Sequence, residues 1–190
     1  MDFVQNVGRR SEIRGEFGNF VEIGTKSLNG NERNLLYRNI TEEGDAAPRF
    51  ADFAWIANAH RLEDGRGAAA IDIEGDGDLD LIVQSFERPA VLLVNQGAPD
   101  RHWLQLRLRG TRSNRDAIGA RVVIEAGGRT QSRELASTEG YLTGRSLLVH
   151  FGLGAAERVD RLTVHWPSGL KTEMTDVAAD RRIEIVEEGD

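Results

Sequence analysis

The sequence predicts an all-β protein whose C-terminal half, residues 100–190, folds as an antiparallel β-sandwich. Three observations lead to this prediction. Apolar and polar residues alternate over several short runs, most of these runs end at glycine or proline turn residues, and almost no segment has a helical period. The chain has 190 residues with 21 glycines and 4 prolines, a composition that suits many tight turns.

The clearest strand pattern is His102–Arg109, in which three leucines alternate with polar residues. Because successive side chains of a strand point to opposite faces, the leucines fall on one face, and Gln105 and the arginines fall on the other. Six further runs with similar patterning follow, and each predicts a strand: Ala120–Ala126, Thr130–Ala136, Leu147–Phe151, Arg161–Trp166, Leu170–Thr175 and Arg182–Glu187. Seven short strands joined by tight turns are typical of a two-sheet sandwich.

The first half of the chain, residues 1–99, is organised differently. Ala68–Ile71 and Leu81–Val83 are short, continuous apolar runs, which are typical of buried strands. Leu35–Asn39 resembles Val91–Asn95, so similar strand endings recur on either side of the acidic segment between them. We therefore expect a separate β-rich domain before the sandwich.

The N-terminal segment and the composition bound the cellular context. Met1–Arg10 has no long apolar core, so we do not expect a signal peptide within it, and the longest apolar runs are too short for membrane insertion. Further on, Phe20–Ile23 is compatible with a strand and Ser11–Glu16 with one helical turn.

Cysteine content and charge exclude several classes of function. With 0 cysteines the chain has no disulfide, no thiolate nucleophile and no cysteine-ligated zinc or iron–sulfur site. A net charge of −7 with scattered Lys and Arg argues against a nucleic-acid partner. The acidic excess gathers in one loop and in a C-terminal tail that we interpret as a solvated end. The tail carboxylates are Glu184, Glu187, Glu188 and Asp190.

The acidic loop, Asp72–Asp80, carries the one specific chemical pattern. Calcium needs six to eight oxygen ligands, and carboxylates at alternate positions of a loop wrap one ion if the chain turns after the fifth position. Gly77 at the sixth position permits that turn. We therefore expect a calcium site whose ligands are Asp72, Glu74, Asp76, Asp78 and Asp80.

The expected calcium site has three alternatives. An EF-hand places a bidentate Glu at position twelve, where this chain has Val83 in a strand-like run, so the loop is not an EF-hand. A solvated acidic turn without an ion is the second alternative, and a magnesium site is the third, disfavoured because the strict octahedral shell of magnesium seldom uses so long an all-protein loop. Repulsion among carboxylates crowded into nine residues favours the cation over the empty turn.

Several separated motifs resemble known families. The acidic loop with its flanks Gly67–Ile71 and Leu81–Val83 resembles an FG-GAP (VCBS-type) repeat of a β-propeller. Five further motifs are similar to the ASPIC/UnbV domain: His102-Trp103-Leu104, Gly110–Ala120, Gly140-Tyr141-Leu142, Val149–Gly154 and Val164–Gly169. Together the motifs resemble the C-terminal end of bacterial relatives of cartilage acidic protein.

The resemblance implies a propeller-blade-like β-sheet carrying a calcium loop at residues 1–99, followed by an ASPIC/UnbV β-sandwich at residues 100–190. It also implies a secreted or cell-surface calcium-binding protein. Two departures stand out: Glu74 replaces the usual Asp or Asn, and Thr143-Gly144 replaces the Ser-Gln that ends the family's Gly-Tyr-Leu-Ser-Gln segment.

Other chemical residues have simpler interpretations. His150 and His165 alternate with apolar residues and are expected on the surface, although a two-histidine metal site is an alternative. Trp103 and Trp166 are expected in the core, with a sugar platform as the alternative. The polar segment Arg112–Asp116 predicts a stabilised turn or, alternatively, a loop that contacts a ligand.

The motifs of common enzyme classes are missing from the sequence, which has no Gly-x-Ser-x-Gly, no P-loop and no His-Glu-x-x-His. We therefore assign no catalytic residue and expect a non-enzymatic, calcium-binding, extracellular-type interaction module with a protein or glycan partner. The alternative is a calcium-dependent enzyme of a biosynthetic pathway, of the cyclase or isomerase type, in which the ion polarises a substrate oxygen.

Overall fold

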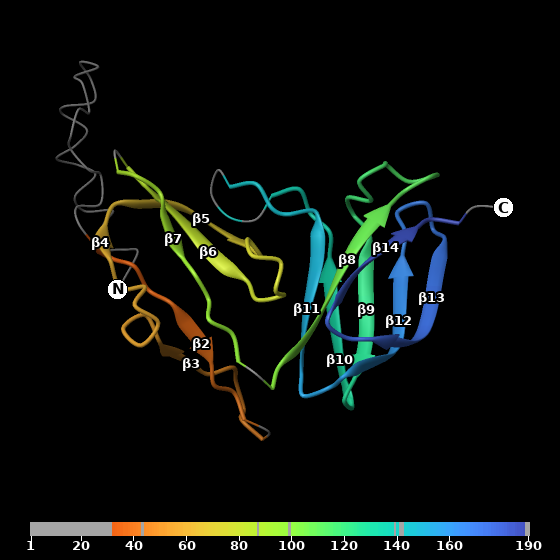
Figure 1. The fold of residues 1–190 in the computed structure, drawn as a ribbon, viewed down its shortest axis with the longest axis horizontal. Helices are drawn as coiled ribbons and strands as arrows, with labels where there is room; N and C mark the ends of the chain where they lie inside the picture. Colours follow the sequence, from red (N-terminus) through yellow and green to blue (C-terminus); the bar gives the residue numbers. More distant parts are fainter. Residues whose placement is uncertain are drawn as a thin grey trace, which may run out of the picture. The chain divides into compact units, whose positions relative to one another are not determined.

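The computed structural model describes residues 32–42, 44–86, 88–98, 100–138, 140 and 143–188. All regular structure in these segments is β, which confirms the expected all-β class (Figure 1). No helix in the described part of the chain is long and apolar enough to cross a membrane. The expectations for Ser11–Glu16 and Phe20–Ile23 lie outside the described residues.

The chain forms two compact units. One consists of Met1–Arg66 with Gln84–Ala90, and the other of Gly67–Val83 with Val91–Asp190. The expected domain boundary at residue 100 stays a prediction. This division places the acidic loop in the same compact unit as the sandwich.

Two sheets form the sandwich, and all seven expected strands are present. The four-stranded sheet has the order β10-β9-β12-β13, and the three-stranded sheet has the order β11-β8-β14. The strands are β8 His102–Arg109, β9 Arg121–Ala126, β10 Arg129–Glu134, β11 Leu148–Gly154, β12 Arg158–His165, β13 Lys171–Ala178 and β14 Arg181–Val186.

One strand departs from the antiparallel arrangement, because β14 pairs in parallel with β8. Only Ala179 and Asp180 join β13 to β14, and these two strands belong to different sheets. Asp180 has a φ of 57° and donates its backbone N–H to the carbonyl of Trp103 at 2.8 Å. This corner turns the chain from one sheet to the other instead of making a hairpin.

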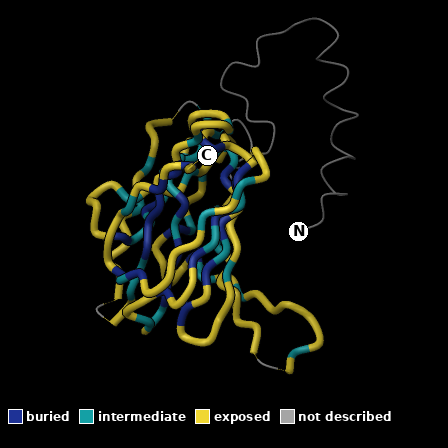
Figure 2. The backbone as a smooth tube through the Cα atoms, turned by 90° about the vertical axis from the view of Figure 1, so that its right-hand side faces the viewer, coloured by how far each residue is buried: buried dark blue, intermediate teal, exposed yellow. Residues whose placement is uncertain are grey.

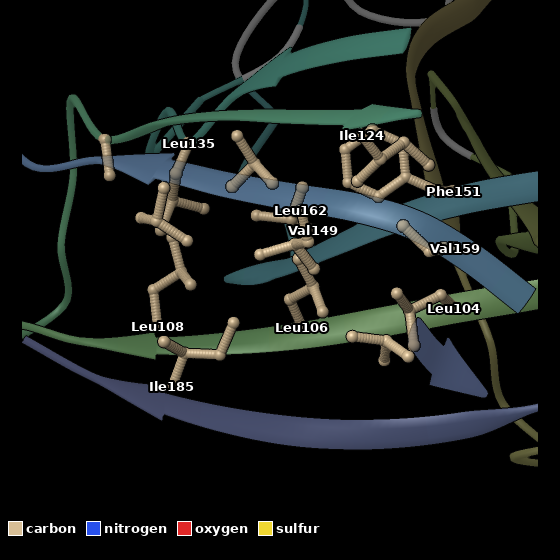
Figure 3. Close-up of a cluster of buried hydrophobic side chains, with 14 of the residues drawn as sticks. Leu104, Leu106, Leu108, Ile124, Leu135, Val149, Phe151, Val159, Leu162 and Ile185 are labelled. Carbon is tan, nitrogen blue, oxygen red and sulfur yellow. The ribbon is translucent and has the colours of Figure 1, made fainter. Parts of the chain in front are cut away.

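The hydrophobic core lies between the two sheets of the sandwich. The leucines of β8 are buried in it, as the alternation predicts, and the labelled side chains of the two sheets point toward one another (Figure 3). Full burial of a leucine, isoleucine or phenylalanine contributes about 1.5–3 kcal/mol, so this cluster dominates the stability of the unit. Buried positions gather along the strands of the sandwich (Figure 2).

A three-stranded sheet with the order β5-β6-β7 flanks the acidic loop. The apolar runs form strands as expected, but β5 is mostly exposed and Leu92 of β7 is 44% exposed. A strand is buried on both faces only where layers pack on both, and a local apolar run does not specify those layers. The strands are β5 Gly65–Ile71, β6 Asp80–Ser85 and β7 Val91–Leu93.

The other unit contains two small antiparallel sheets, which pair β1 with β4 and β2 with β3. In it Trp55 stacks on the ring of His60 at a centroid distance of 3.6 Å, although the tryptophan stays 66% exposed. The strands are β1 Glu32–Arg33, β2 Tyr37–Asn39, β3 Phe50–Asp52 and β4 Leu62–Glu63.

Candidate functional site

The acidic loop wraps around the carboxylate of its first residue, Asp72. Oδ1 of Asp72 accepts a hydrogen bond from the N–H of Gly75 at 2.7 Å, and Oδ2 accepts one from the N–H of Gly77 at 3.1 Å. Gly75 and Gly77 have φ angles of 76° and 94°, a region that glycine enters without steric cost. The glycines therefore allow the backbone to fold over the carboxylate.

Asp80, the last expected ligand, closes the loop at its base. It is 1% exposed, and Oδ2 accepts the N–H of Ile73 at 3.1 Å. Oδ1 of Asp80 accepts the N–H of Asn95 at 2.8 Å, which connects the loop to the segment after β7. Asp80 therefore holds the beginning of the loop and a sequence-distant strand end together.

The remaining carboxylates are less well satisfied. Asp76 accepts the N–H of Asp78 at 3.0 Å, but the carboxylates of Glu74 and Asp78 accept no hydrogen bond from any described residue. Burial raises the pKa of Glu74 and of Asp78, and the surrounding carboxylates raise it further. Two unpaired anions thus lie among like charges.

The five expected ligands share one loop but do not converge into a coordination shell. No group of three or more histidine, aspartate or glutamate side chains among the described residues has the arrangement of a metal centre. The donors do fit a hard cation in their chemistry, because a carboxylate oxygen that accepts one hydrogen bond, such as Oδ1 of Asp72, keeps a lone pair for a metal, and the carboxylates of Glu74 and Asp78 accept none from the described residues. Calcium binding stays a prediction.

The sandwich contributes a buried partner to the loop. The side-chain amide of Gln105, on the outer face of β8, donates from Nε2 to Oδ2 of Asp72 at 2.7 Å. Oε1 of the same glutamine accepts two hydrogen bonds from Arg182 of β14, from Nε at 2.9 Å and from Nη2 at 2.8 Å. Gln105 is 1% exposed, so a polar side chain expected to face solvent is buried under the loop.

The expectation that Trp103 belongs to the core is wrong, because this residue lies beside the acidic loop. It precedes Leu104, which is in the core, so its side chain points to the outer face of β8. A Cβ added to Gly77 would lie 1.9 Å from Cε2 of Trp103, which shows how closely the loop backbone approaches the indole. The prediction for Trp166 is confirmed, since this residue is buried in the core cluster.

His150 and His165 lie in different sheets, on β11 and β12. His150 is half-buried and pairs across the strands with Gln105. Its Nδ1 is buried and has no hydrogen-bond partner among the described residues. Burial lowers the pKa of His150, the nearby Asp72 raises it, and Arg133 lowers it. The expectation of a simple surface histidine therefore does not hold for His150.

Glu187, which the sequence places in an expected solvated tail, is buried in the structure. It is 1% exposed, and its Oε2 accepts the backbone N–H groups of Thr111 at 2.8 Å, Arg112 at 2.8 Å and Ser113 at 2.7 Å. Its Oε1 accepts the hydroxyls of Ser113 at 2.9 Å and Ser168 at 2.5 Å. This carboxylate is therefore a buried hydrogen-bond acceptor that holds residues 111–113 and Ser168 to the end of the chain's last strand, and it is not part of a solvated tail.

The period-two pattern contained a signal for this burial. Ile183, Ile185 and Glu187 occupy alternate positions of one strand pattern, so they share the inward face. Burial alone raises the pKa of Glu187, but the hydrogen bonds from Ser168, Ser113 and Thr111 outweigh it and lower this pKa to about 2. The group is an anion at neutral pH.

The segment Arg112–Asp116 forms a turn stabilised by Asn114. Its Oδ1 accepts the N–H of Ile118 at 2.9 Å, and its Nδ2 donates to the carbonyl of Ile118 at 2.8 Å. Ala117, directly after this segment, has a φ of 54°, which is unusual for a residue with a Cβ. These contacts support the interpretation as a stabilised turn.

Comparison with known protein families finds a match within the C-terminal half of the chain. Residues 110–190 match the family described as ASPIC and UnbV, which confirms that part of the expected resemblance. The FG-GAP/VCBS repeat stays a prediction.

The chain is also homologous to cartilage acidic protein 1 from several vertebrates. It is 32% identical to the Homo sapiens protein over 163 residues, which cover 74% of this chain and 24% of that protein. It is 35% identical to the Mus musculus protein over 130 residues, covering 65% of this chain and 19% of the relative. The Xenopus tropicalis protein is 34% identical over 111 residues, which are 55% of this chain and 16% of that relative. The chain thus spans less than a quarter of the length of each of these relatives.

Proposed function

We propose that this chain, whose residues 110–190 match the ASPIC and UnbV family, is a non-enzymatic, extracellular-type interaction module stabilised by calcium. The acidic loop holds the ion, and the sandwich presents its loops to a protein or a glycan. Homology to cartilage acidic protein 1 supports the comparison with an extracellular-type module, and a secreted or cell-surface location is part of the proposal.

One observation carries the calcium proposal: five carboxylates share one loop, and those of Glu74, which is exposed, and Asp78, which is half-buried, accept no hydrogen bond from the described residues. The raised pKa values of these two groups agree with that crowding. Like charges that lack donors are unfavourable, and a cation with oxygen ligands relieves that repulsion. The residues that would hold it are Asp72, Glu74, Asp76, Asp78 and Asp80.

A bound calcium ion supplies positive charge that neutralises the loop, while the protein's own groups keep the loop in place. The backbone N–H groups of Gly75 and Gly77 orient Asp72. Asp80 fixes the loop to Asn95. The site is therefore anchored on both sides of the acidic run, which suits a structural ion better than an exchanging one. The calcium-dependent enzyme remains an alternative prediction.

We expect metal-free protein to unfold at a higher temperature when calcium is added and to change little with magnesium. A ligand that binds only the native state at 100 times its Kd stabilises it by about 2.7 kcal/mol. Differential scanning calorimetry after treatment with a chelator, with each ion titrated separately, measures this shift. An unchanged melting temperature at millimolar calcium contradicts the proposal.

Two matched variants locate the effect. Asp78→Asn keeps the shape of a proposed ligand and removes its charge, so we expect a much smaller shift with calcium. Asp160→Asn makes the same change at an exposed carboxylate on β12 and is expected to respond to calcium like the unsubstituted chain. Equal responses of the two variants would place the ion elsewhere.

The interaction part of the proposal needs its own readout. Binding to glycan and extracellular-protein arrays, with calcium and with chelator, is expected to show ligands that are retained only in calcium. Ligands that bind equally in both conditions would separate the recognition surface from the loop.

A further inference from the structure

The side chain of Gln105 connects the sandwich to the first residue of the acidic loop, Asp72. Asp72 has three hydrogen-bond donors in the described structure: two backbone N–H groups of the loop and the side-chain amide of Gln105. Only the glutamine comes from outside the loop, from strand β8 of the sandwich core. It is therefore the direct side-chain link from the sandwich to the first proposed ligand.

The orientation of that amide is fixed by charge. An amide group offers a donor at Nε2 and an acceptor at Oε1, and the two ends are interchangeable in shape. Arg182 donates two hydrogen bonds to Oε1, so only Nε2 is left to face the carboxylate of Asp72. Without the guanidinium, Oε1 loses both of its donors, and the amide is held in place only by its hydrogen bond to Asp72.

The environment strengthens this arrangement. Gln105 is 1% exposed, and His150 lies directly across from it on β11 while Arg182 lies across from it on β14. Arg182 itself is exposed, but the amide of Gln105 is shielded from water, where hydrogen bonds are stronger and an unpaired polar group is costly. The three residues form a polar row on the outer face of an otherwise core-forming sheet, with the acidic loop at its centre.

We propose that Gln105 and Arg182 are positioning residues that set the calcium affinity of the acidic loop by orienting Asp72. This inference rests on the proposed function. Groups that hydrogen-bond to a metal ligand usually change metal affinity by about 10–100-fold when removed, because they fix the geometry of the ligand and its basicity. Through this chain of hydrogen bonds, the fold of the sandwich and the occupancy of the loop become coupled.

The test compares calcium dissociation constants, measured by isothermal titration calorimetry, with melting temperatures in chelator. Gln105→Leu removes both hydrogen-bonding ends at nearly constant volume, and we expect its Kd for calcium to rise about 10-fold or more. Arg182→Met leaves Gln105 and the whole loop intact, and we expect its Kd to rise about 3–10-fold through the freed amide. Arg161→Met, at an exposed arginine of β12 in the other sheet, is the matched control and should keep the original Kd.

A second readout distinguishes positioning from general loss of stability. In metal-free protein, the amide hydrogens of Gly75 and Gly77 are expected to exchange faster with solvent in both variants, while the amides of β9 and β12 keep their protection. An unchanged Kd in both variants, alongside measurable binding by the unsubstituted chain, would overturn this inference and leave the calcium proposal standing. Absence of calcium binding by the unsubstituted chain would overturn both.

Discussion

Replacement of Glu187 by alanine is expected to destabilise the protein by about 3–5 kcal/mol, because each buried donor left without a partner costs about 1–3 kcal/mol. The carboxylate is the acceptor for three consecutive backbone N–H groups, from Thr111 to Ser113, and for the hydroxyl of Ser168. Alanine leaves these N–H and hydroxyl donors without their acceptor. Urea denaturation followed by circular dichroism measures the loss.

The adjacent glutamate provides the control. Glu188 is exposed, so Glu188→Ala removes the same charge from the neighbouring position without removing a buried acceptor. We expect it to change the free energy of unfolding by less than about 0.5 kcal/mol. Similar losses of unfolding free energy for the two variants would mean that the hydrogen bonds of Glu187 contribute no more than an ordinary surface charge.

The contribution of Glu187 also depends on pH. Its pKa is about 2 in the folded protein, below the ordinary value of 4.5. A carboxylate with a lowered pKa stabilises the fold fully above its unfolded pKa, and this stabilisation is lost as the pH falls toward the folded value. At about 1.4 kcal/mol per pKa unit, the amount at stake is about 3 kcal/mol.

Glu187→Gln tests this dependence because it removes the titration and keeps the size. The difference in unfolding free energy between the unsubstituted chain and this variant is expected to be largest above pH 5 and to shrink steadily toward pH 2. A difference that stays constant over this range would show that the fold does not use the ionised carboxylate.

The fold of the sandwich was predictable because its signal is local. Alternation in His102–Arg109 placed the leucines in the core, and turn residues separated the other strands. Strand direction was not predictable in the same way. The corner at Asp180, which makes β14 run parallel to β8, depends on which sheet the next strand joins, and alternation carries no such information.

The candidate site was predictable only in part, for a similar reason. The spacing of the acidic residues and Gly77 marked the loop from the sequence alone. Gln105 was predictable only as part of the outer face of a strand, and Trp103 was expected in the core, because what covers a face is decided by packing between distant segments. Glu187 shows the opposite case: its alternation with Ile185 pointed inward, but its charge and terminal position suggested solvent.

Replacement of Gly77 by alanine is expected to destabilise the protein by about 2–5 kcal/mol. The positive φ of 94° contributes about 1–2 kcal/mol of strain for a residue with a Cβ. The new methyl group would also overlap the indole of Trp103, at 1.9 Å from Cε2, and forcing such a group into a packed contact adds about 1–3 kcal/mol. Thermal and urea unfolding in chelator measure the effect without the ion.

Gly75→Ala separates the two causes within the same loop. Gly75 also has a positive φ, of 76°, but a Cβ there meets nothing within 4 Å, so only the backbone strain remains. Adding Trp103→Ala to Gly77→Ala should recover the steric part of the loss, giving a favourable coupling between the two substitutions. Equal losses at the two glycines without such coupling would mean that the loop does not pack on Trp103. In that event the coupling between loop and sandwich would depend on the hydrogen bonds of Gln105 alone.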